Sequence, residues 1–193
     1  MQEIWRLEKE QKVCSIDVDG ILVNYPFCWI EFINKKSDNN FSNLSEAKKG
    51  LSYSEYRILK IQYRESGAKA TLPVIKGASK FVKILQENGF KVILMTARPY
   101  RKHRRIWKDT MEWLKTNNIN PDGMIWQKEK HWSVLQEFPY MSFMVEDNAE
   151  IANQVARIGY KVYVLDNEYN KQKLEKNCSR VFSLEEILKS EVI

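Results

Sequence analysis

The sequence predicts an α/β fold, in which helices cover both faces of a parallel sheet. Three observations lead to this prediction: short apolar runs recur along the chain, helix-like stretches separate most of them, and 44% of the residues are hydrophobic. A strand followed by a helix and then by another strand forms a parallel pair with a right-handed crossover. With 193 residues, the chain is long enough for one main domain and a small accessory module.

Five short apolar runs are predicted to be the strands of this sheet. They span residues 13–16, 91–95, 123–126, 142–145 and 161–165.

Three stretches between these runs have apolar residues at helical spacing. The first, residues 76–88, is followed by Gly89, which fits the glycine that often ends a helix. Residues 106–117 and 149–158 show the same pattern, and Gly159 follows the last of them. Their alternation with the strands predicts an open sheet that is covered on both faces.

Residues 26–72 break the alternation, because no strand pattern occurs in them. Helix-like stretches at 27–35 and 53–65 are joined by the polar run 37–40. A segment of this length is too long for a plain loop. We therefore expect a small helical module at 26–72, placed over the carboxyl end of the first strand, and a core domain made of residues 1–25 and 73–193.

The charge and the cysteines limit the class of protein. A formal net charge of +6 favours an anionic substrate or partner. Cys14, Cys28 and Cys178 are odd in number and lack Cys-x-x-Cys spacing, which argues against a disulfide framework and a zinc site. Residues 1–10 are charged, and no apolar run approaches the roughly 18 residues of a membrane helix. A soluble, cytoplasmic protein without membrane contact is expected, and its oligomeric state stays open.

Polar residues follow three of the predicted strands, at the edge where ligands bind in open α/β sheets. The three segments are Asp17-Val18-Asp19-Gly20, Thr96-Ala97-Arg98-Pro99 and Glu146-Asp147-Asn148. Four acidic groups at neighbouring strand ends repel one another unless a cation lies among them, and carboxylate oxygens suit Mg²⁺. The residue types also allow a structural interpretation, with Asp17 and Asp19 in a turn and the third segment capping a helix.

This ordered set resembles the haloacid dehalogenase superfamily of phosphatases, from about Val13 to Leu188. The family's first motif matches the Asp17 to Gly20 segment, and its second matches the apolar strand that ends in Thr96. The third motif is a lysine ahead of the fourth strand, and either Lys128 or Lys130 fits it. The acidic pair Glu146-Asp147 matches the fourth. The resemblance implies a Rossmann-like core with a small helical cap inserted after the first strand.

The resemblance also implies a mechanism for phosphomonoester hydrolysis. Asp17 is then the nucleophile that forms an aspartyl-phosphate, and Asp19 is the general acid and base, a role for which a raised pKa is expected. Thr96 and the nearby backbone would bind the phosphoryl oxygens, and the motif lysine would neutralise their charge. Ala97 and Arg98 are the implied substrate-binding residues.

A Mg²⁺ ion is the cofactor that the resemblance implies. Its ligands would be Asp17, the Asp19 carbonyl and Asp147, with Glu146 in support.

Two groups within the superfamily suggest substrates. The helical insert and the Thr96-Ala97-Arg98-Pro99 segment resemble 5′(3′)-deoxyribonucleotidase-like phosphatases, which favours nucleoside monophosphates. The phosphatase domain of polynucleotide kinase/3′-phosphatases is resembled by the order of that segment, a basic helix, Met111-Glu112-Trp113-Leu114 and then Val145-Glu146-Asp147. Nucleic-acid ends are therefore the alternative, and the basic stretch 98–108 fits them. That stretch is otherwise a solvated helix face. A catalytically silent binding protein with this fold is the third hypothesis.

Overall fold

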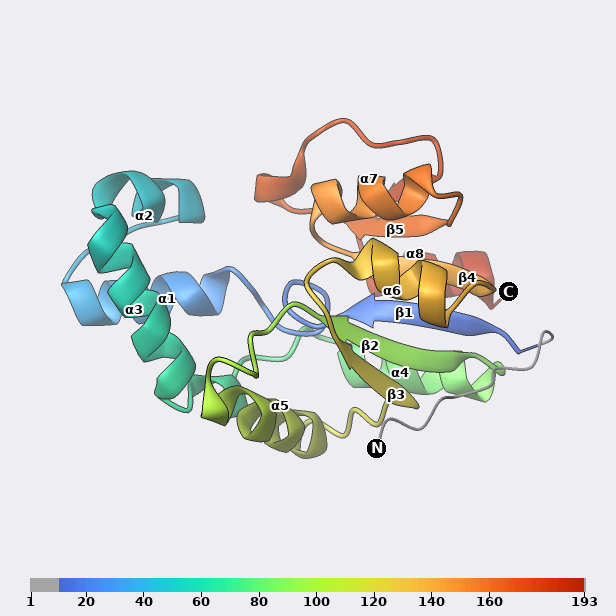
Figure 1. Ribbon diagram of the computed structural model, residues 1–193, viewed down its shortest axis with the longest axis horizontal. Helices are drawn as coiled ribbons and strands as arrows, with labels where there is room; N and C mark the ends of the chain where they lie inside the picture. Colours follow the sequence, from blue (N-terminus) through green and yellow to red (C-terminus); the bar gives the residue numbers. More distant parts are fainter. Residues whose placement is uncertain (1–10, 193) are drawn as a thin grey trace.

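Six parallel strands form the sheet of the computed structural model, which describes residues 11–192 (Figure 1). Their order across the sheet is β3-β2-β1-β4-β5-β6. The strands are β1 (Val13–Asp17), β2 (Lys91–Thr96), β3 (Gly123–Trp126), β4 (Met141–Glu146), β5 (Val162–Leu165) and β6 (Cys178–Val181). The first five lie on the predicted apolar runs, and β6 is an additional strand at the edge. The predicted fold class is thus confirmed.

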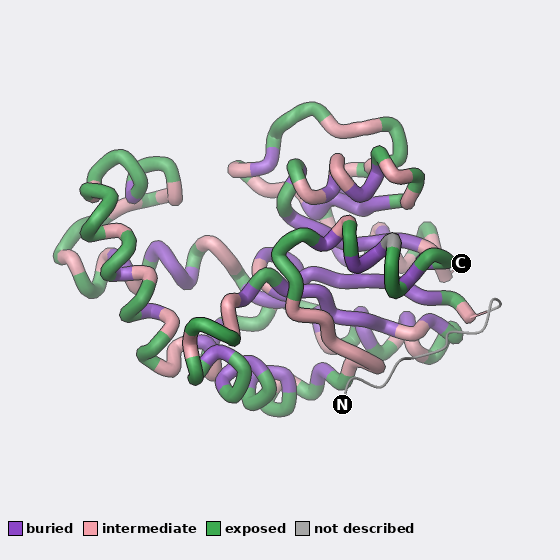
Figure 2. Tube along the Cα trace, in the orientation of Figure 1, coloured by how far each residue is buried: buried purple, intermediate pink, exposed green. Residues whose placement is uncertain are grey.

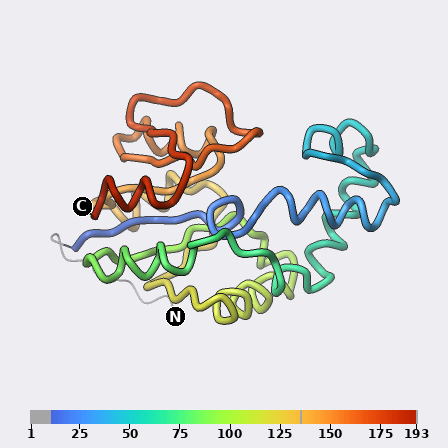
Figure 3. Tube along the Cα trace, turned by 180° about the vertical axis from the view of Figure 1, so that it is seen from behind, coloured from blue at the N-terminus to red at the C-terminus, as the bar shows by residue number. Residues whose placement is uncertain are grey.

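Helices cover the two faces of the sheet because successive strand residues point to opposite sides. On β1, Cys14 and Ile16 belong to one apolar cluster and Val13 belongs to the other. The helices α4 (Ala78–Glu87), α5 (Arg104–Thr116) and α8 (Leu184–Glu191) pack on the first face, whereas α6 (Lys130–Glu137) and α7 (Ala149–Arg157) pack on the second. Figures 1 and 3 show the two faces from opposite sides, and in Figure 2 the inner strands β1, β2, β4 and β5 are largely buried.

The segment between β1 and β2 is helical. It contains α1 (Phe27–Ser37), α2 (Leu44–Gly50), α3 (Tyr53–Glu65) and the short 3₁₀ helix η1 (Ala68–Ala70). Helix α2, which the sequence pattern did not predict, begins where the Asn43 side chain accepts a hydrogen bond from the Glu46 backbone. Ser52 and Glu55 form a capping box at the start of α3. Figure 1 shows α1, α2 and α3 beyond the end of the sheet to which β1 points.

Aromatic side chains hold α1 and α3 together. The Trp29 ring lies 6.0 Å from Phe32 and 5.1 Å from Tyr63, measured between ring centroids. The Trp29 indole also donates a hydrogen bond to the Tyr56 hydroxyl at 3.1 Å. These rings therefore form the core of the insert. The Phe27 and Tyr53 side chains, by contrast, are exposed.

The lengths of these helices bear on membrane insertion. Among residues 11–192, no helix combines the length and the apolar character that crossing a bilayer requires. Residues 1–10, whose charged composition contributed to the expectation of a cytoplasmic protein, lie outside the described residues, as does Ile193.

Candidate active site

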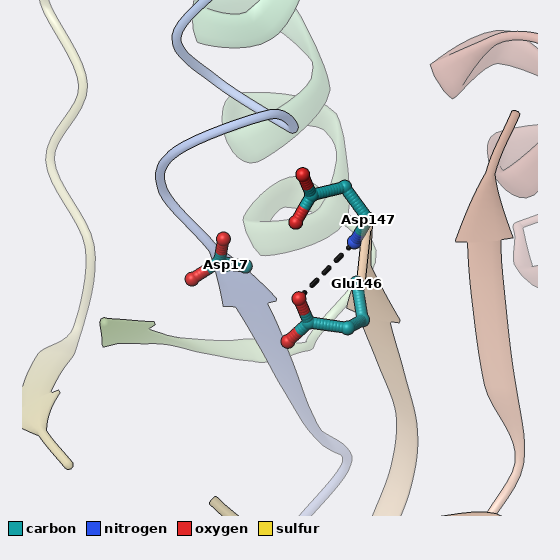
Figure 4. Close-up of side chains that lie close together, drawn as sticks. All are labelled: Asp17, Glu146 and Asp147. Carbon is teal, nitrogen blue, oxygen red and sulfur yellow. Dashed lines mark hydrogen bonds between the residues drawn. The ribbon is translucent and has the colours of Figure 1, made fainter. Parts of the chain in front are cut away.

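Three buried carboxylates meet at the carboxyl ends of the neighbouring strands β1 and β4 (Figure 4). Asp17 is the last residue of β1, Glu146 is the last residue of β4, and Asp147 follows it. One oxygen from each lies within 4.8 Å of the other two. The sheet topology therefore brings together Asp17 and Glu146, which are 129 positions apart in the sequence.

Lys130 lies against this cluster. Its Nζ donates to Asp17 Oδ1 at 2.5 Å and to Glu146 Oε2 at 2.7 Å, and the side chain is 1% exposed. Burial opposes the charged ammonium, but Asp17 and Glu146 outweigh it and raise the pKa of Lys130 above its usual range. Lys128 is exposed to solvent instead. Of the two lysines that fit the motif, the structure brings Lys130 to the cluster.

The cluster still carries more negative than positive charge, because one ammonium faces three carboxylates. Burial raises the pKa of Asp17 to about 7, with Lys130 opposing the rise and Glu146 adding to it. Burial and the charges of Glu146 and Asp17 also raise the pKa of Asp147. A divalent cation would relieve this repulsion, and three carboxylates are ligands that Mg²⁺ accepts. The residues present therefore fit the implied metal.

Neighbouring groups fix the position of Asp147. The Tyr169 hydroxyl donates to its Oδ2, and Asn170 Nδ2 donates to its backbone carbonyl at 2.7 Å. Gly20 has a φ of 96°, and a Cβ at this position would collide with the Asp147 carboxylate. Asn148 caps helix α7 by accepting from the Glu150 backbone at 2.9 Å. Asn148 thus serves as the helix cap, and the Asp147 side chain faces the cluster.

Asp19 binds a different set of partners. Arg98 donates to its two oxygens, from Nη2 at 2.7 Å and from Nε at 2.9 Å, and Lys69 donates to Oδ1 at 3.0 Å. Arg98 also donates from Nη1 to Thr110 Oγ1 on α5 at 2.8 Å. Lys69 comes from η1, at the end of the helical insert. The insert and the core therefore meet at the Asp19 carboxylate.

The expectation of a raised pKa for Asp19 is wrong. Burial alone would raise it, but Arg98 and Lys69 outweigh burial and lower the pKa of this carboxyl well below its usual range. The nearest charges to Asp19 are cations. Repulsion between neighbouring carboxylates therefore raises the pKa of Asp17 and Asp147, and not that of Asp19.

Thr96 and Ala97 lie beside Asp17, since β2 is the neighbour of β1 and Met95 pairs with Asp17 in register. The Thr96 hydroxyl accepts a hydrogen bond from the Arg98 backbone at 3.2 Å, and its side chain is buried. Ala97 is exposed. Ile21, which follows the first motif, is fully buried in the core.

Lys69 and Tyr169 contact the predicted site residues, yet no sequence pattern predicted them. Lys69 stands in Gly67-Ala68-Lys69-Ala70, which matches no motif, and it is 50 positions from Asp19. Their contacts depend on how the insert and the segment after β5 fold back on the sheet, so spacing along the chain carried no signal.

The basic stretch after Arg98 lies mainly on the surface. Arg101, Lys102, Arg104, Arg105 and Lys108 are exposed. His103 is an exception, because its Nδ1 lies 2.5 Å from Glu65 Oε1 at the end of α3.

Comparison with known proteins places this geometry in context. No model of a known protein family matches the chain. A protein of Clostridium acetobutylicum that is named a nucleotidase is 23% identical to it over 187 residues, with 92% of each chain covered. A haloacid dehalogenase-like hydrolase of Streptococcus pneumoniae superimposes with a TM-score of 0.65 at 11% identity, over 93% of this chain and 98% of its own.

A second solved structure contains a metal and an anion. It is a D,D-heptose 1,7-bisphosphate phosphatase of B. bronchiseptica complexed with magnesium and phosphate, with a TM-score of 0.57 at 10% identity, over 93% of this chain and 99% of its own. These likenesses confirm at the level of the fold what the ordered motifs indicated: the chain has the fold of the haloacid dehalogenase superfamily.

Proposed function

We propose that this protein is a Mg²⁺-dependent phosphatase that hydrolyses nucleoside monophosphates. The observation that carries the proposal is the meeting of Asp17, Asp147 and Lys130 at the carboxyl ends of β1 and β4. A nucleophile, a charge-neutralising lysine and a set of metal ligands are what phosphoryl transfer through a covalent intermediate requires. The likeness to a protein named a nucleotidase supports the choice of substrate.

Asp17 is the proposed nucleophile. Its carboxylate attacks phosphorus, the bond from phosphorus to the leaving oxygen breaks, and an aspartyl-phosphate results. Water then attacks that phosphorus and releases inorganic phosphate, which restores the carboxylate. Lys130, bound to Asp17 and Glu146, holds the nucleophile in place and offsets negative charge on the phosphoryl group.

The proposed Mg²⁺ site uses Asp17, the Asp19 carbonyl and Asp147, with Glu146 in support. When bound, the ion would supply positive charge to the phosphoryl oxygens and to the crowded carboxylates. Tyr169 and Gly20 keep Asp147 in position for this role.

Asp19 is the proposed general acid and base. The ionised carboxylate that Arg98 and Lys69 stabilise suits the second step, in which it takes a proton from the attacking water. To donate a proton to the leaving oxygen in the first step, it must first become protonated. We expect this to require that Lys69 moves away from Asp19 Oδ1, since each cation favours the charged form.

Thr96, Ala97 and Arg98 are proposed to serve substrate binding in two ways. The Thr96 hydroxyl and the exposed backbone at Ala97 lie beside Asp17, where they would donate to phosphoryl oxygens. The Arg98 guanidinium binds Asp19 and Thr110. We therefore assign Arg98 the positioning of Asp19 in addition to any contact with the substrate.

Residues 26–72 are proposed to be a cap that selects the leaving group, and residues 1–25 and 73–193 are proposed to be the core that carries out the chemistry. The contact of Lys69, at the end of the insert, with Asp19 supports a position of this segment over the leaving-group side of the site. A cytoplasmic location is proposed as well, because the three cysteines are free thiols.

A second candidate function is removal of 3′-phosphates from nucleic-acid ends. The exposed basic residues of the stretch 98–108 favour it, because they would bind a phosphodiester backbone. Hydrolysis of a 3′-phosphorylated oligonucleotide should then fall steeply with added salt, whereas hydrolysis of a mononucleotide should not.

A panel of phosphomonoesters with Mg²⁺ tests the proposal. Nucleoside monophosphates, sugar phosphates and 3′-phosphorylated oligonucleotides are compared by phosphate release, and the first group should have a higher kcat/KM than the sugar phosphates. The Asp17→Asn variant should lose at least about 1,000-fold in kcat because the nucleophile is removed.

The Asp38→Asn variant is the matched control, because Asp38 is exposed and asparagine tolerates its left-handed backbone. Near-normal turnover by Asp17→Asn would contradict the nucleophile assignment. The absence of turnover by the unmodified protein on every phosphomonoester would favour the silent binding protein.

A further inference from the structure

Lys60 on α3 is a half-buried cation without an anionic partner. Its Nζ lies 4.3 Å from the ring centroid of Trp29 and 5.3 Å from that of Tyr25. Within residues 11–192, no hydrogen bond or ion pair satisfies this ammonium. Aromatic faces attract a cation but accept no ordinary hydrogen bond, so its three N–H donors stay available to solvent or to a ligand. An acceptor from outside the chain would complete the site.

The rings that hold Lys60 are themselves fixed. Trp29 is fully buried, its indole donates to the Tyr56 hydroxyl, and its ring packs at 5.6 Å on Tyr56. Tyr63 lies on another side of the same indole at 5.1 Å. The Lys60 ammonium therefore lies against an aromatic ring that is packed into the core of the insert.

Tyr63 connects this cage to the proposed catalytic residues. Its ring lies 5.1 Å from that of Trp29, and the Lys69 ammonium lies 5.1 Å from the Tyr63 ring centroid. Lys69 in turn donates to Asp19 Oδ1 at 3.0 Å. A continuous series of contacts therefore joins Lys60 to Asp19, the proposed general acid and base on the leaving-group side of the site.

The charge balance on this side favours an additional anion. Lys69 and Arg98 already pair with Asp19, so this carboxylate does not pair with Lys60. Arg64, one turn further along α3, is close enough to Lys60 for the two charges to repel. Its Nη1 contacts Nε2 of His103 at 3.4 Å, and the Glu65 carboxylate contacts the other nitrogen of that ring, so among residues 11–192 no carboxylate pairs directly with Arg64. Burial, followed by the repulsion from Lys69, lowers the pKa of Lys60 to about 7, which an anionic ligand would reverse.

We infer that Lys60, together with Arg64, forms a subsite for a second phosphate, carried by the leaving group of the substrate. This inference rests on the proposed function, because it takes the scissile phosphoryl group to lie at Asp17. Hydrolysis consumes one water and releases one inorganic phosphate, while the second phosphate stays bonded to the product. A nucleoside 3′,5′-bisphosphate carries such a group, and the phosphodiester next to a 3′-phosphorylated end supplies the same chemistry. A nucleoside monophosphate lacks it.

Steady-state kinetics with matched substrates test the subsite. The substrates are adenosine 3′,5′-bisphosphate, the 3′- and 5′-monophosphates of adenosine, and a 3′-phosphorylated trinucleotide. The unmodified enzyme should prefer a substrate with two phosphates by about tenfold in kcat/KM, the factor that one charge-assisted contact gives. Preference for the bisphosphate alone indicates a small-molecule substrate, and preference for the trinucleotide indicates a nucleic-acid end.

The Lys60→Gln variant should bring this preference to about 1, mainly through KM, whereas Lys60→Arg should keep most of it. Lys48→Gln, at an exposed lysine on α2 of the same insert, is the matched control and should keep the preference of the unmodified enzyme. An unmodified enzyme without preference, or a Lys60→Gln variant that retains it, would overturn the inference.

Binding measurements separate this inference from the proposed function. Titration calorimetry with adenosine 3′,5′-bisphosphate is carried out on the Asp17→Asn protein, with and without Lys60→Gln. A roughly tenfold loss of affinity on removing Lys60 supports the subsite even if no phosphomonoester is hydrolysed. Equal affinity in the two proteins rejects the subsite even if nucleotides are hydrolysed. Equal melting temperatures show that both variants are folded.

Discussion

The two halves of the candidate site contain the same functional group in opposite environments. The acidic half consists of Asp17, Glu146 and Asp147 with Lys130, and it is built from strand ends and the start of α6. The basic half consists of Asp19 with Arg98 and Lys69, and it needs the helical insert for completion.

The pKa values of Asp17 and Asp19 move in opposite directions although the residues are two positions apart. Both carboxyls are desolvated, so burial does not distinguish them. What distinguishes them is the sign of the nearest charges: Asp17 has a carboxylate beside it as well as Lys130, and Asp19 has two cations. The elements that surround these two residues of one motif therefore shift their pKa values in opposite directions.

The Lys130→Gln substitution should have the largest effect on stability. It leaves the buried Asp17 and Glu146 without their cation, so we expect the free energy of unfolding to fall by about 3–5 kcal/mol in metal-free buffer. Urea denaturation measures this change. Lys128→Gln, at the exposed neighbouring lysine, is the control and should stay within about 0.5 kcal/mol of the unmodified protein. Equal effects of the two substitutions would contradict the importance of Lys130 to the acidic half.

Addition of Mg²⁺ should have the next largest effect, and should act through the acidic half alone. At 100 times the Kd, the ion should stabilise the protein by about 2.7 kcal/mol, which thermal unfolding detects as a higher Tm. Asp147→Asn should remove most of this gain because it deletes a proposed ligand, and Asp38→Asn should keep it. A gain that survives Asp147→Asn would place the ion elsewhere.

The Lys69→Gln substitution should have the smallest effect of the three. Asp19 would keep its bidentate contact with Arg98, so we expect a loss of only about 1–2 kcal/mol in the free energy of unfolding. Lys76→Gln, at an exposed lysine before α4, serves as control. If Lys69→Gln destabilised the protein as much as Lys130→Gln, the two halves would depend equally on their lysines, and the comparison would fail.

The strands that the sequence predicted are those that contain a run of apolar residues. β1 to β5 carry this signal, and their observed bounds differ from the predicted ones by at most one residue at either end. β6 was not predicted because the polar residues Ser179 and Arg180 interrupt its apolar run. Such polar residues suit a strand at the edge of a sheet. Helix α2 escaped because its residues are mostly polar and only Ala47 is buried.

The site was predictable where it depends on strand ends and unpredictable where it depends on the insert. The alternation of strands and helices predicts a parallel sheet. In such a sheet Asp17, Glu146 and Asp147 lie together at the carboxyl ends of neighbouring strands. The choice between Lys128 and Lys130 needed the start of α6 in three dimensions. The lowered pKa of Asp19 needed the contacts with Arg98 and Lys69 across 79 and 50 positions, which no local pattern encodes.

The ion pair between Lys69 and Asp19 joins the insert to the sheet. A displacement of η1 relative to the sheet would change both the opening of the site and the charge that faces Asp19. The same displacement would then admit a substrate and change the readiness of Asp19 for proton transfer. A spectroscopic probe on α3 that reports the position of the insert would, for the same reason, report the ionisation of Asp19.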